Sequence, residues 1–298
     1  MKKIILTSML ASTFLLAQEN FIEIGLGYKG TKNNFSTDSD EKISTFSKAK
    51  SDNSVLPNLK FYYGQEISKD INLFIKSDQK ELKLGSKIAF DNSNLSFGFK
   101  TKLFEEEWED PFLLNTNRKE TDISENGLFL AYQLPFNNYI NTTISYEYAK
   151  KKYDSDKLIP VLKRDANIHN LSLKNIFILD YANIITNIEY EKYNAKGKAS
   201  SYDKIGLDLG ISKTLNPKTT FSLFAGYAKK EYDQSNPVLN KKIDANIFKS
   251  MANIKYKEPF DYKNTYIKTS LIYKNEDANN QFYDKTATYG LFSIGYNF

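Results

Sequence analysis

Two arginines are the least expected chemical groups in this chain. Of the 41 lysine and arginine residues, only Arg118 and Arg164 are arginine. A guanidinium is planar and can donate two parallel hydrogen bonds to a carboxylate or a phosphate, whereas a lysine ammonium is a point charge. The pattern predicts ion pairs that tie long loops together; a ligand-binding site and a compositional drift toward lysine are the alternatives. Three aspartates close to them in the sequence are candidate partners: Asp110, Asp122 and Asp165.

Catalytic and metal-binding groups are sparse. Acyl transfer and proteolysis need a base, usually histidine, beside a nucleophile or an acid. The single histidine, His169, has no motif around it and is expected at the solvated rim of a strand. The acidic runs "DSDE" (38–41) and "EEEWED" (105–110) could hold Ca²⁺ loosely, although such runs are usually only solvated. We predict no enzyme activity, no cofactor and no metal site, and the net charge of +5 gives no reason to expect nucleic acid.

The elements that position these residues are expected to be β-strands. After residue 17 the sequence mostly alternates apolar and polar residues, which is the period of a strand with one apolar face. No later segment reaches the run of about 18 apolar residues that a transmembrane helix needs. Fourteen segments show the alternation: 20–29, 56–65, 70–76, 81–90, 95–103, 127–134, 139–149, 169–179, 183–192, 203–213, 219–230, 246–257, 264–274 and 285–298.

The connections between these segments alternate in length. Short ones with turn residues, such as "DNSN" (91–94) and "PFNN" (135–138), alternate with long polar ones. This layout is typical of antiparallel strands that cross a membrane, with tight turns on the periplasmic side and loops outside. The exception is "SDQK" (77–80), which is tight where a long loop is due. With both termini periplasmic the strand number is even, so we predict about 14 strands, with 12 or 16 as alternatives, in one domain.

Each predicted strand has one apolar face and one small or polar face. Ile205, Leu207 and Leu209, for example, alternate with Gly206 and Asp208. Backbone groups in lipid must all be paired, so exported strands with a lipid-compatible face have to close into a barrel. We therefore predict an all-β fold, a closed antiparallel transmembrane β-barrel. A soluble sandwich or lipocalin-like barrel with the apolar face inward is the alternative that the pattern alone leaves open.

The N-terminus predicts export. Lys2 and Lys3 form a basic region, a short apolar stretch follows, and Ala17 can precede a cleavage site. We assign residues 1–17 to a secretory signal peptide and residues 18–298 to the barrel. Export without a helical anchor predicts the outer membrane of a Gram-negative bacterium, in contact with lipid and lipopolysaccharide.

The C-terminus has its own pattern. Its last strand places apolar side chains at every second position up to the final residue. This resembles the C-terminal signal that outer-membrane barrels present to the bacterial barrel-assembly machinery, which is therefore an expected partner. The residues of this assembly signal are Phe292, Ile294, Tyr296 and Phe298.

Several short motifs resemble one known family. They are "WEDPF" (108–112), which begins with Trp108, then Arg118, Thr121 and Asp122, "LKRDA" (162–166) and "QFYDK" (281–285). Together they are similar to a bacterial barrel family catalogued as domain of unknown function 2860. The resemblance implies an envelope barrel of about this length and implies no activity.

These features favour a small, porin-like channel for passive diffusion. Fourteen strands enclose more space than the eight that side chains can fill. The predicted inner face carries more lysines than acids, which concentrates anions, so small anionic or neutral solutes are expected. A surface-exposed structural or binding barrel with a closed lumen is the alternative. The lysines expected to line the lumen include Lys60, Lys83, Lys87, Lys100, Lys204, Lys249, Lys255 and Lys268.

Overall fold

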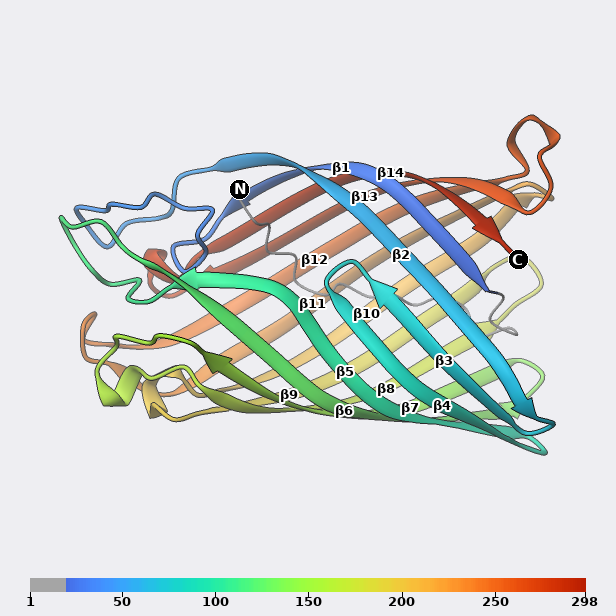
Figure 1. The fold of residues 1–298 in the computed structure, drawn as a ribbon, viewed down its shortest axis with the longest axis horizontal. Helices are drawn as coiled ribbons and strands as arrows, with labels where there is room; N and C mark the ends of the chain where they lie inside the picture. Colours follow the sequence, from blue (N-terminus) through green and yellow to red (C-terminus); the bar gives the residue numbers. More distant parts are fainter. Residues whose placement is uncertain (1–19) are drawn as a thin grey trace.

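The computed structural model describes residues 20–298, except for the side chain of Phe104, so the predicted signal peptide at residues 1–17 lies outside the described residues. Figure 1 shows the strands running obliquely around a cylinder. The strands are β1 (Phe21–Lys32), β2 (Asp52–Ser68), β3 (Ile71–Asp78), β4 (Glu81–Phe90), β5 (Ser93–Trp108), β6 (Glu120–Asn137), β7 (Ile140–Tyr153), β8 (Ala166–Ile178), β9 (Asn183–Ala195), β10 (Tyr202–Asn216), β11 (Thr219–Asn236), β12 (Lys241–Lys257), β13 (Thr265–Ala278) and β14 (Lys285–Asn297).

The strands form a closed antiparallel barrel. Each strand pairs with its neighbours in the sequence, and β1 pairs with β14 from Phe21 opposite Asn297 to Lys32 opposite Thr286. The predicted count of fourteen strands is confirmed. Four short 3₁₀ helices lie in the connections: η1 (Pro160–Leu162), η2 (Lys198–Ser200), η3 (Pro259–Asp261) and η4 (Gln281–Tyr283).

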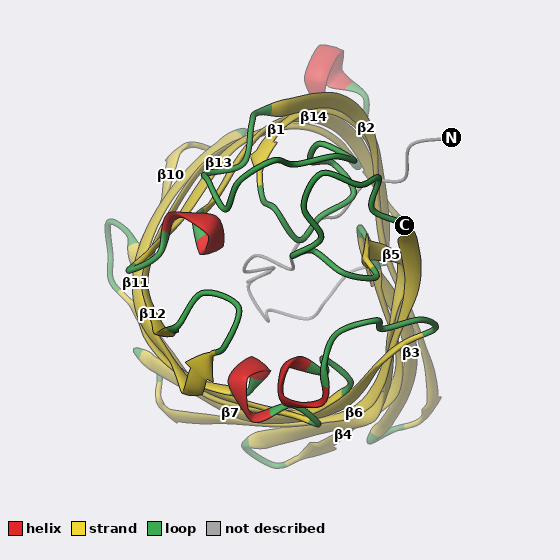
Figure 2. Ribbon diagram, turned by 90° about the vertical axis from the view of Figure 1, so that its left-hand side faces the viewer, coloured by secondary structure: helices red, strands yellow, loops and turns green. Residues whose placement is uncertain are grey.

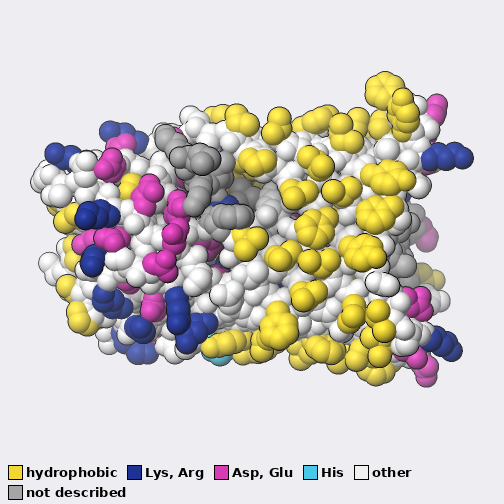
Figure 3. Space-filling view, in the orientation of Figure 1, with side chains coloured by type: hydrophobic (Ala, Val, Ile, Leu, Met, Phe, Trp, Pro, Cys, Tyr) yellow, Lys and Arg dark blue, Asp and Glu magenta, His cyan; other side chains and the backbone are white. Residues whose placement is uncertain are grey.

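The two faces of the wall differ as the alternation predicts. On β10, Ile205, Leu207 and Leu209 are 59%, 46% and 53% exposed, whereas Asp208 on the other face is 4% exposed. Figure 3 shows a broad hydrophobic band on one face of the barrel, with charged side chains gathered beyond its two ends, and the exposed apolar residues come from strands all round the barrel. A lipid bilayer would cover such a belt, so the soluble alternative, in which the apolar face points inward, is wrong. In the part of the chain that the structure describes, no helix is long and apolar enough to cross a membrane.

Two strands are much shorter than their neighbours. β3 has 8 residues and β4 has 10, between β2 with 17 and β5 with 16. The tight connection predicted at 77–80 is a turn at Gln79 and Lys80. In Figure 1 the β3–β4 hairpin ends near the middle of the barrel's length. Most other strands extend beyond the predicted segments at the loop end, because their polar outer residues continue the ladder after the apolar alternation stops.

Part of the inner wall is built from aromatic rings laid over glycines. Phe74 and Phe129 lie 6.1 Å apart between ring centres and meet over Gly85 of β4, which is paired with Gly98 of β5. A Cβ at position 98 would lie 2.1 Å from the carbonyl oxygen of Leu84, so only glycine fits there without a backbone shift. The two rings therefore lie close to the wall where Gly85 leaves room, and the close approach of the β4 and β5 backbones requires glycine at position 98.

This packing predicts that Gly98→Ala destabilises the barrel. Overpacking against backbone should lower the free energy of unfolding by about 1 to 3 kcal/mol. The matched control is Gly290→Ala, because a Cβ at position 290 would meet only the side chain of Leu271 at 3.7 Å. Urea unfolding in lipid vesicles, followed by the gel shift between folded and heated protein, measures both. Equal stability of the two variants would contradict the packing argument.

Candidate functional site

The loop end of the barrel is covered by connections that fold inward from the rim. Four are named here: L1 (33–51, between β1 and β2), L3 (109–119, β5 to β6), L4 (154–165, β7 to β8) and L7 (279–284, β13 to β14). Figure 2 looks onto this end and shows the loops turned over the barrel. Apolar side chains of L3, L4 and L7 meet those of η2, β11 and β12 in one cluster, against which Phe35, Ile43 and Phe46 of L1 also pack. Its buried members are Phe112, Leu158, Leu162, Ala199, Tyr232, Ile243, Phe282 and Tyr283.

The centre of this mouth cluster is aromatic. Phe282 of L7 is fully buried, and its ring centre lies 5.3 Å from that of Phe112 in L3 and 5.7 Å from that of Phe35 in L1. Burial of three phenylalanine side chains from three loops is favourable by several kcal/mol. The loops therefore hold one another in place through contacts distant in sequence.

Arg118 fastens L1 to L3. Its Nη1 donates to the carbonyl oxygen of Asn34 at 2.8 Å and to that of Pro111 at 3.3 Å. Its Nη2 donates to Ser39 Oγ at 3.1 Å and to the carbonyl oxygen of Asp40. The guanidinium lies 4.6 Å from the ring centre of Trp108, and the arginine is only 2% exposed. The planar guanidinium thus donates hydrogen bonds to acceptors in two loops at once, and a lysine ammonium could not do so with the same geometry.

Trp108 completes this clasp. It is the last residue of β5, and its indole Nε1 donates to Ser39 Oγ at 3.0 Å. Its backbone N–H donates to the carbonyl oxygen of Phe35 at 3.2 Å, and the backbone N–H of Arg118 donates to that of Glu41 at 2.8 Å. L1 is therefore tied by side chains and by backbone to the end of β5 and to L3.

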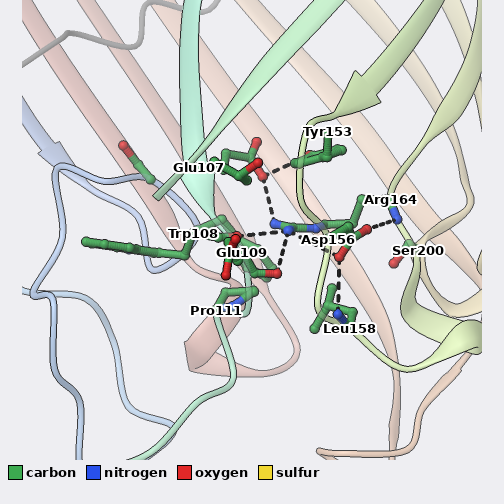
Figure 4. A network of polar contacts seen from close by, with 12 residues as sticks. Glu107, Trp108, Glu109, Pro111, Tyr153, Asp156, Leu158, Arg164 and Ser200 are labelled. Carbon is green, nitrogen blue, oxygen red and sulfur yellow. Dashed lines mark hydrogen bonds and ion pairs between the residues drawn. The ribbon is translucent and has the colours of Figure 1, made fainter. Parts of the chain in front are cut away.

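Arg164 makes a second clasp between L4 and the end of β5 (Figure 4). Its Nη1 lies 3.2 Å from a carboxylate oxygen of Glu107, and its Nη2 donates to the carbonyl oxygens of Trp108 at 2.8 Å and Glu109 at 3.0 Å. Asp156 lies 3.4 Å from Nη2, and the ring of Tyr153 lies beneath the guanidinium at 4.2 Å. Both family-like segments thus converge on the same strand end.

The two guanidinium groups differ in their electrostatics. Loss of solvent is the largest effect on Arg118 and lowers its pKa to about 10, because the charges of Asp40 and Asp110 only partly offset it. Loss of solvent acts on Arg164 too, but Tyr153, Glu107 and Asp156 outweigh it and raise its pKa. Arg118 is therefore a charged donor to neutral carbonyl groups, whereas Arg164 belongs to an ion pair.

The three aspartates expected to pair with these arginines make other contacts or are exposed. Asp110 accepts the backbone N–H of Phe112 at 2.9 Å and shapes the start of L3. Asp165 accepts the backbone N–H of Tyr153 at 2.9 Å and pairs with Lys196, and both bonds oppose the effect of burial, so its pKa is lowered. Asp122 lies on β6 with its side chain exposed. Among residues 20–298, none of the three carboxylates bonds an arginine side chain, so the predicted pairing was wrong.

The lysines expected in the lumen lie on the side of the wall opposite the exposed apolar residues, and most are paired. The pairs join strands across the inner face, as cross-strand charge pairs do. They are Lys60 with Asp78 at 2.6 Å, Lys83 with Glu147 at 2.7 Å, Lys100 with Glu147, Lys204 with Glu189 and Glu191 at 3.0 Å each, Lys249 with Asp208 at 2.8 Å and Lys268 with Glu23 at 3.7 Å; Lys255 lies 3.7 Å from the ring centre of Tyr266, and Lys87 has no ion pair with any described residue.

The inner face carries more glutamate side chains than the sequence predicted. Glu81, Glu107, Glu125 and Glu276 each pair with a lysine there. Three of them, Glu107, Glu125 and Glu276, lie beyond the predicted strand ends, where a face could not be assigned from the sequence. The excess of lysine over acid is therefore smaller than expected.

The last strand closes the barrel. Phe292, Ile294, Tyr296 and Phe298 are 52%, 56%, 46% and 58% exposed, on the lipid-compatible face of β14 and just after it. The backbone N–H of Phe298 donates to the carbonyl oxygen of Asn20 at 2.9 Å. The terminal residue thus takes part in the seam between β14 and β1.

His169 lies on β8 beside two tyrosines. Its Nδ1 is 2.7 Å from Tyr146 Oη, and its ring centre is 5.3 Å from that of Tyr148. Tyr146 is 42% exposed on the outer face, where tyrosines are common in membrane barrels. Within residues 20–298, no group of three or more His, Asp or Glu side chains could hold a metal ion.

Comparison with known proteins gives a family. A profile described as "Protein of unknown function (DUF2860)" matches residues 19–297. The chain belongs to this family. No curated protein matches the sequence. Among solved structures, a Pseudomonas aeruginosa FadL homologue is similar with a TM-score of 0.55 and 10% identity, covering 94% of this chain and 90% of that chain.

A second solved structure has the same fold. The CymD monoaromatic hydrocarbon channel is similar with a TM-score of 0.51 and 10% identity, covering 94% of this chain and 89% of that chain. This DUF2860 protein thus shares its fold, a closed antiparallel β-barrel, with these two proteins, as its resemblance at the sequence level implied.

The clasp predicts that Arg118→Ala loosens L1. Loss of charge-assisted bonds from a buried donor should lower the free energy of unfolding by about 3 kcal/mol and expose L1 to protease. Arg118→Lys should restore only part, because an ammonium cannot reach acceptors on both loops in one plane. Lys119→Ala, at an exposed neighbour, is the control. Mass spectrometry of limited digests locates the cuts; full rescue by lysine would contradict the clasp.

The seam predicts that deletion of Phe298 impairs assembly. The closing strand loses a lipid-facing aromatic side chain and its bond to Asn20, so the fraction of folded, heat-modifiable barrel in the outer membrane should fall several-fold. Phe260→Ala is the control, because Phe260 is 88% exposed in a turn at the same end of the barrel. Wild-type levels of the truncated protein would rule out an assembly role for the terminus.

Proposed function

We propose that this protein is a channel for small solutes in the outer membrane of a Gram-negative bacterium, with a preference for anionic or neutral solutes. The observation that carries the proposal is the presence of lysines on the inner wall without a carboxylate partner. A fourteen-stranded barrel is wider than one that its own side chains can fill. Its contacts in place would be lipid and lipopolysaccharide, and its last strand would be read by the barrel-assembly machinery.

Four inner lysines support the charge preference. Lys76, Lys87, Lys174 and Lys274 make no ion pair with any described residue. Lys76 lies on β3 and Lys174 on β8, so these lysines are spread over several strands of the wall. Unpaired ammonium groups inside a wall of low dielectric constant attract anions. The paired lysines contribute less, because their carboxylates offset them.

The mouth cluster is the observation that favours a second candidate function, a surface barrel with a closed lumen. Loops L1, L3, L4 and L7 bury phenylalanines against one another across the loop end. In the proposed channel this arrangement is a closed state that opens when the loops separate. If the loops stay together, the protein is a surface barrel with a closed lumen, whose function lies in its exposed loops.

The fold comparisons support a channel in general terms. One similar structure is named as a monoaromatic hydrocarbon channel. At 10% identity that likeness concerns the fold, so the solute of that protein carries no weight for this one. The solute preference proposed here rests on the inner wall alone.

The test is the reversal potential of single channels in a planar bilayer under a salt gradient. We expect chloride to be preferred over potassium, with the preference fading as salt screens the wall over about 10 Å at 0.1 M. Lys76→Gln with Lys174→Gln should bring the permeability ratio toward one, whereas Lys263→Gln, in an exposed turn, should not. A preference for potassium would refute the charge assignment, and the absence of conductance would favour the closed barrel.

A further inference from the structure

Two lysines lie exposed on the outer face of β7 at its loop end. Lys151 between them points inward, where its Nζ lies 3.3 Å from a carboxylate oxygen of Glu107. Successive side chains of a strand alternate between its faces, so Lys150 and Lys152 point outward, on the same face as Tyr146. Within residues 20–298, neither of these two lysines has an ion pair or a hydrogen bond. The outer face of β7 thus ends on the loop side in two uncompensated positive charges.

The neighbours of Lys150 add hydrogen-bond donors. In the strand register, Lys150 lies between Asn126 of β6 and Asn167 of β8. Thr101 Oγ1 donates to Asn126 Oδ1 at 2.7 Å, and Tyr148 Oη donates to Asn167 Oδ1 at 3.0 Å. Each amide oxygen is thus bonded, and neither amide nitrogen has an acceptor among the described residues. The row therefore presents two amide NH₂ groups on either side of an ammonium group, which is a set of donors suited to an anion.

The position of this row along the barrel matches a lipid headgroup. On the side away from the loops the outer face is aliphatic, with Leu128, Ile144 and Leu171 at 51%, 51% and 50% exposure. Tyr146 follows, with its Oη 2.7 Å from His169 Nδ1, and the amide and lysine row comes next. Aliphatic, then aromatic, then polar side chains are the order met on passing from acyl chains to headgroups. Figure 3 shows the same change along one face of the barrel, with Lys and Arg beyond the hydrophobic band at the loop end.

The acids nearby in the fold leave the membrane side of this row free of negative charge. Asp165 of L4 is paired with Lys196 at 2.9 Å. Asp122 of β6 and Asp154 of L4 meet beyond Lys152, where the N–H of Asp154 donates to the carbonyl oxygen of Asp122 at 3.0 Å. These two acids lie on the loop side of the lysines, away from the hydrophobic band. An anion held at the level of the membrane surface therefore meets the donors before it meets a carboxylate.

We infer that the outer face of β6, β7 and β8 at this level binds a phosphate group of a lipid headgroup in the outer leaflet. Lys150 and Lys152 supply the charge, and the amides of Asn126 and Asn167 supply hydrogen bonds to the phosphate oxygens. The acyl chains lie against the aliphatic side chains below. In an outer membrane this lipid is lipid A, the phosphorylated anchor of lipopolysaccharide. The site rests on the outer-membrane placement in the proposed function, and it does not depend on conductance.

The first test measures the charge contribution. Native mass spectrometry of the folded barrel in detergent counts bound lipid A as its concentration is raised. Lys150→Gln with Lys152→Gln should weaken this binding by about ten-fold or more, because each basic side chain near an anionic headgroup attracts it. The matched control is Lys213→Gln with Lys263→Gln, which removes two exposed lysines at the turn end and should leave binding within about two-fold. Equal loss in both double variants, or no loss in the first, would overturn the site.

The second test addresses the amides. Asn167→Asp keeps the shape and the oxygen that Tyr148 bonds, but it replaces a donor beside Lys150 with a negative charge, so lipid A binding should fall by about ten-fold. Asn246→Asp is the control, because Asn246 on the outer face of β12 also accepts a tyrosine hydroxyl, that of Tyr227 at 2.6 Å. Equal binding by the two variants would contradict a role for the amide row.

The third test identifies the ligand. Lipid A from which both phosphates have been removed should bind the unmodified protein as weakly as intact lipid A binds the lysine variant; equally tight binding of the two lipids would overturn the phosphate assignment. Displacement of lipid A by excess inorganic phosphate at matched ionic strength would indicate a site for the free anion and would overturn the lipid assignment. Conductance is a separate readout: its absence with the binding differences intact would support the lipid site and count against the channel alone.

Discussion

Every backbone N–H and C=O at membrane depth needs a hydrogen-bond partner, and this one requirement organises the whole molecule. Thirteen pairs of strands that follow each other in the sequence meet this requirement, and a fourteenth pair, between β1 and β14, closes the barrel. The β3–β4 hairpin is too short to meet the requirement along the full length of β2 and β5. Both arginines of the chain, Arg118 and Arg164, bind at the end of β5, where this strand pairing is missing.

The two arginines stabilise that region in different ways. Arg118 binds mostly carbonyl oxygens, so it fixes the path of L1 without a partner charge. Arg164 binds Glu107 and Asp156 and fixes L4 to the same end of β5. A change in the charge of Glu107 would affect only the second clasp directly.

Much of the barrel could be predicted because lipid imposes a simple rule on the sequence. The alternation on β10 and the final aromatic series on β14 place their side chains on the outer face without further information. The partners of Arg118 could not be predicted. Asn34 lies 84 residues away, and its acceptor is a backbone carbonyl that any residue would supply. The acids of the inner wall were missed for a related reason, because the faces of Glu107 and Glu276 depend on register beyond the apolar segments. The tight turn at Gln79 was visible, but its effect on the wall depends on the lengths of the neighbouring strands.

L1 is held at the loop end of the barrel by its pairing with β5 and L3. Ile43 of L1 and Leu114 of L3 form a parallel bridge, and the N–H of Asn115 donates to the carbonyl oxygen of Ile43 at 2.7 Å. In this cysteine-free protein, Ile43→Cys combined with Leu114→Cys should form a disulfide spontaneously in the folded barrel, because bridged residues lie within the distance that a disulfide spans. The account predicts near-complete cross-linking by mass spectrometry under mild oxidation. Two free thiols in a folded, heat-modifiable barrel would contradict it.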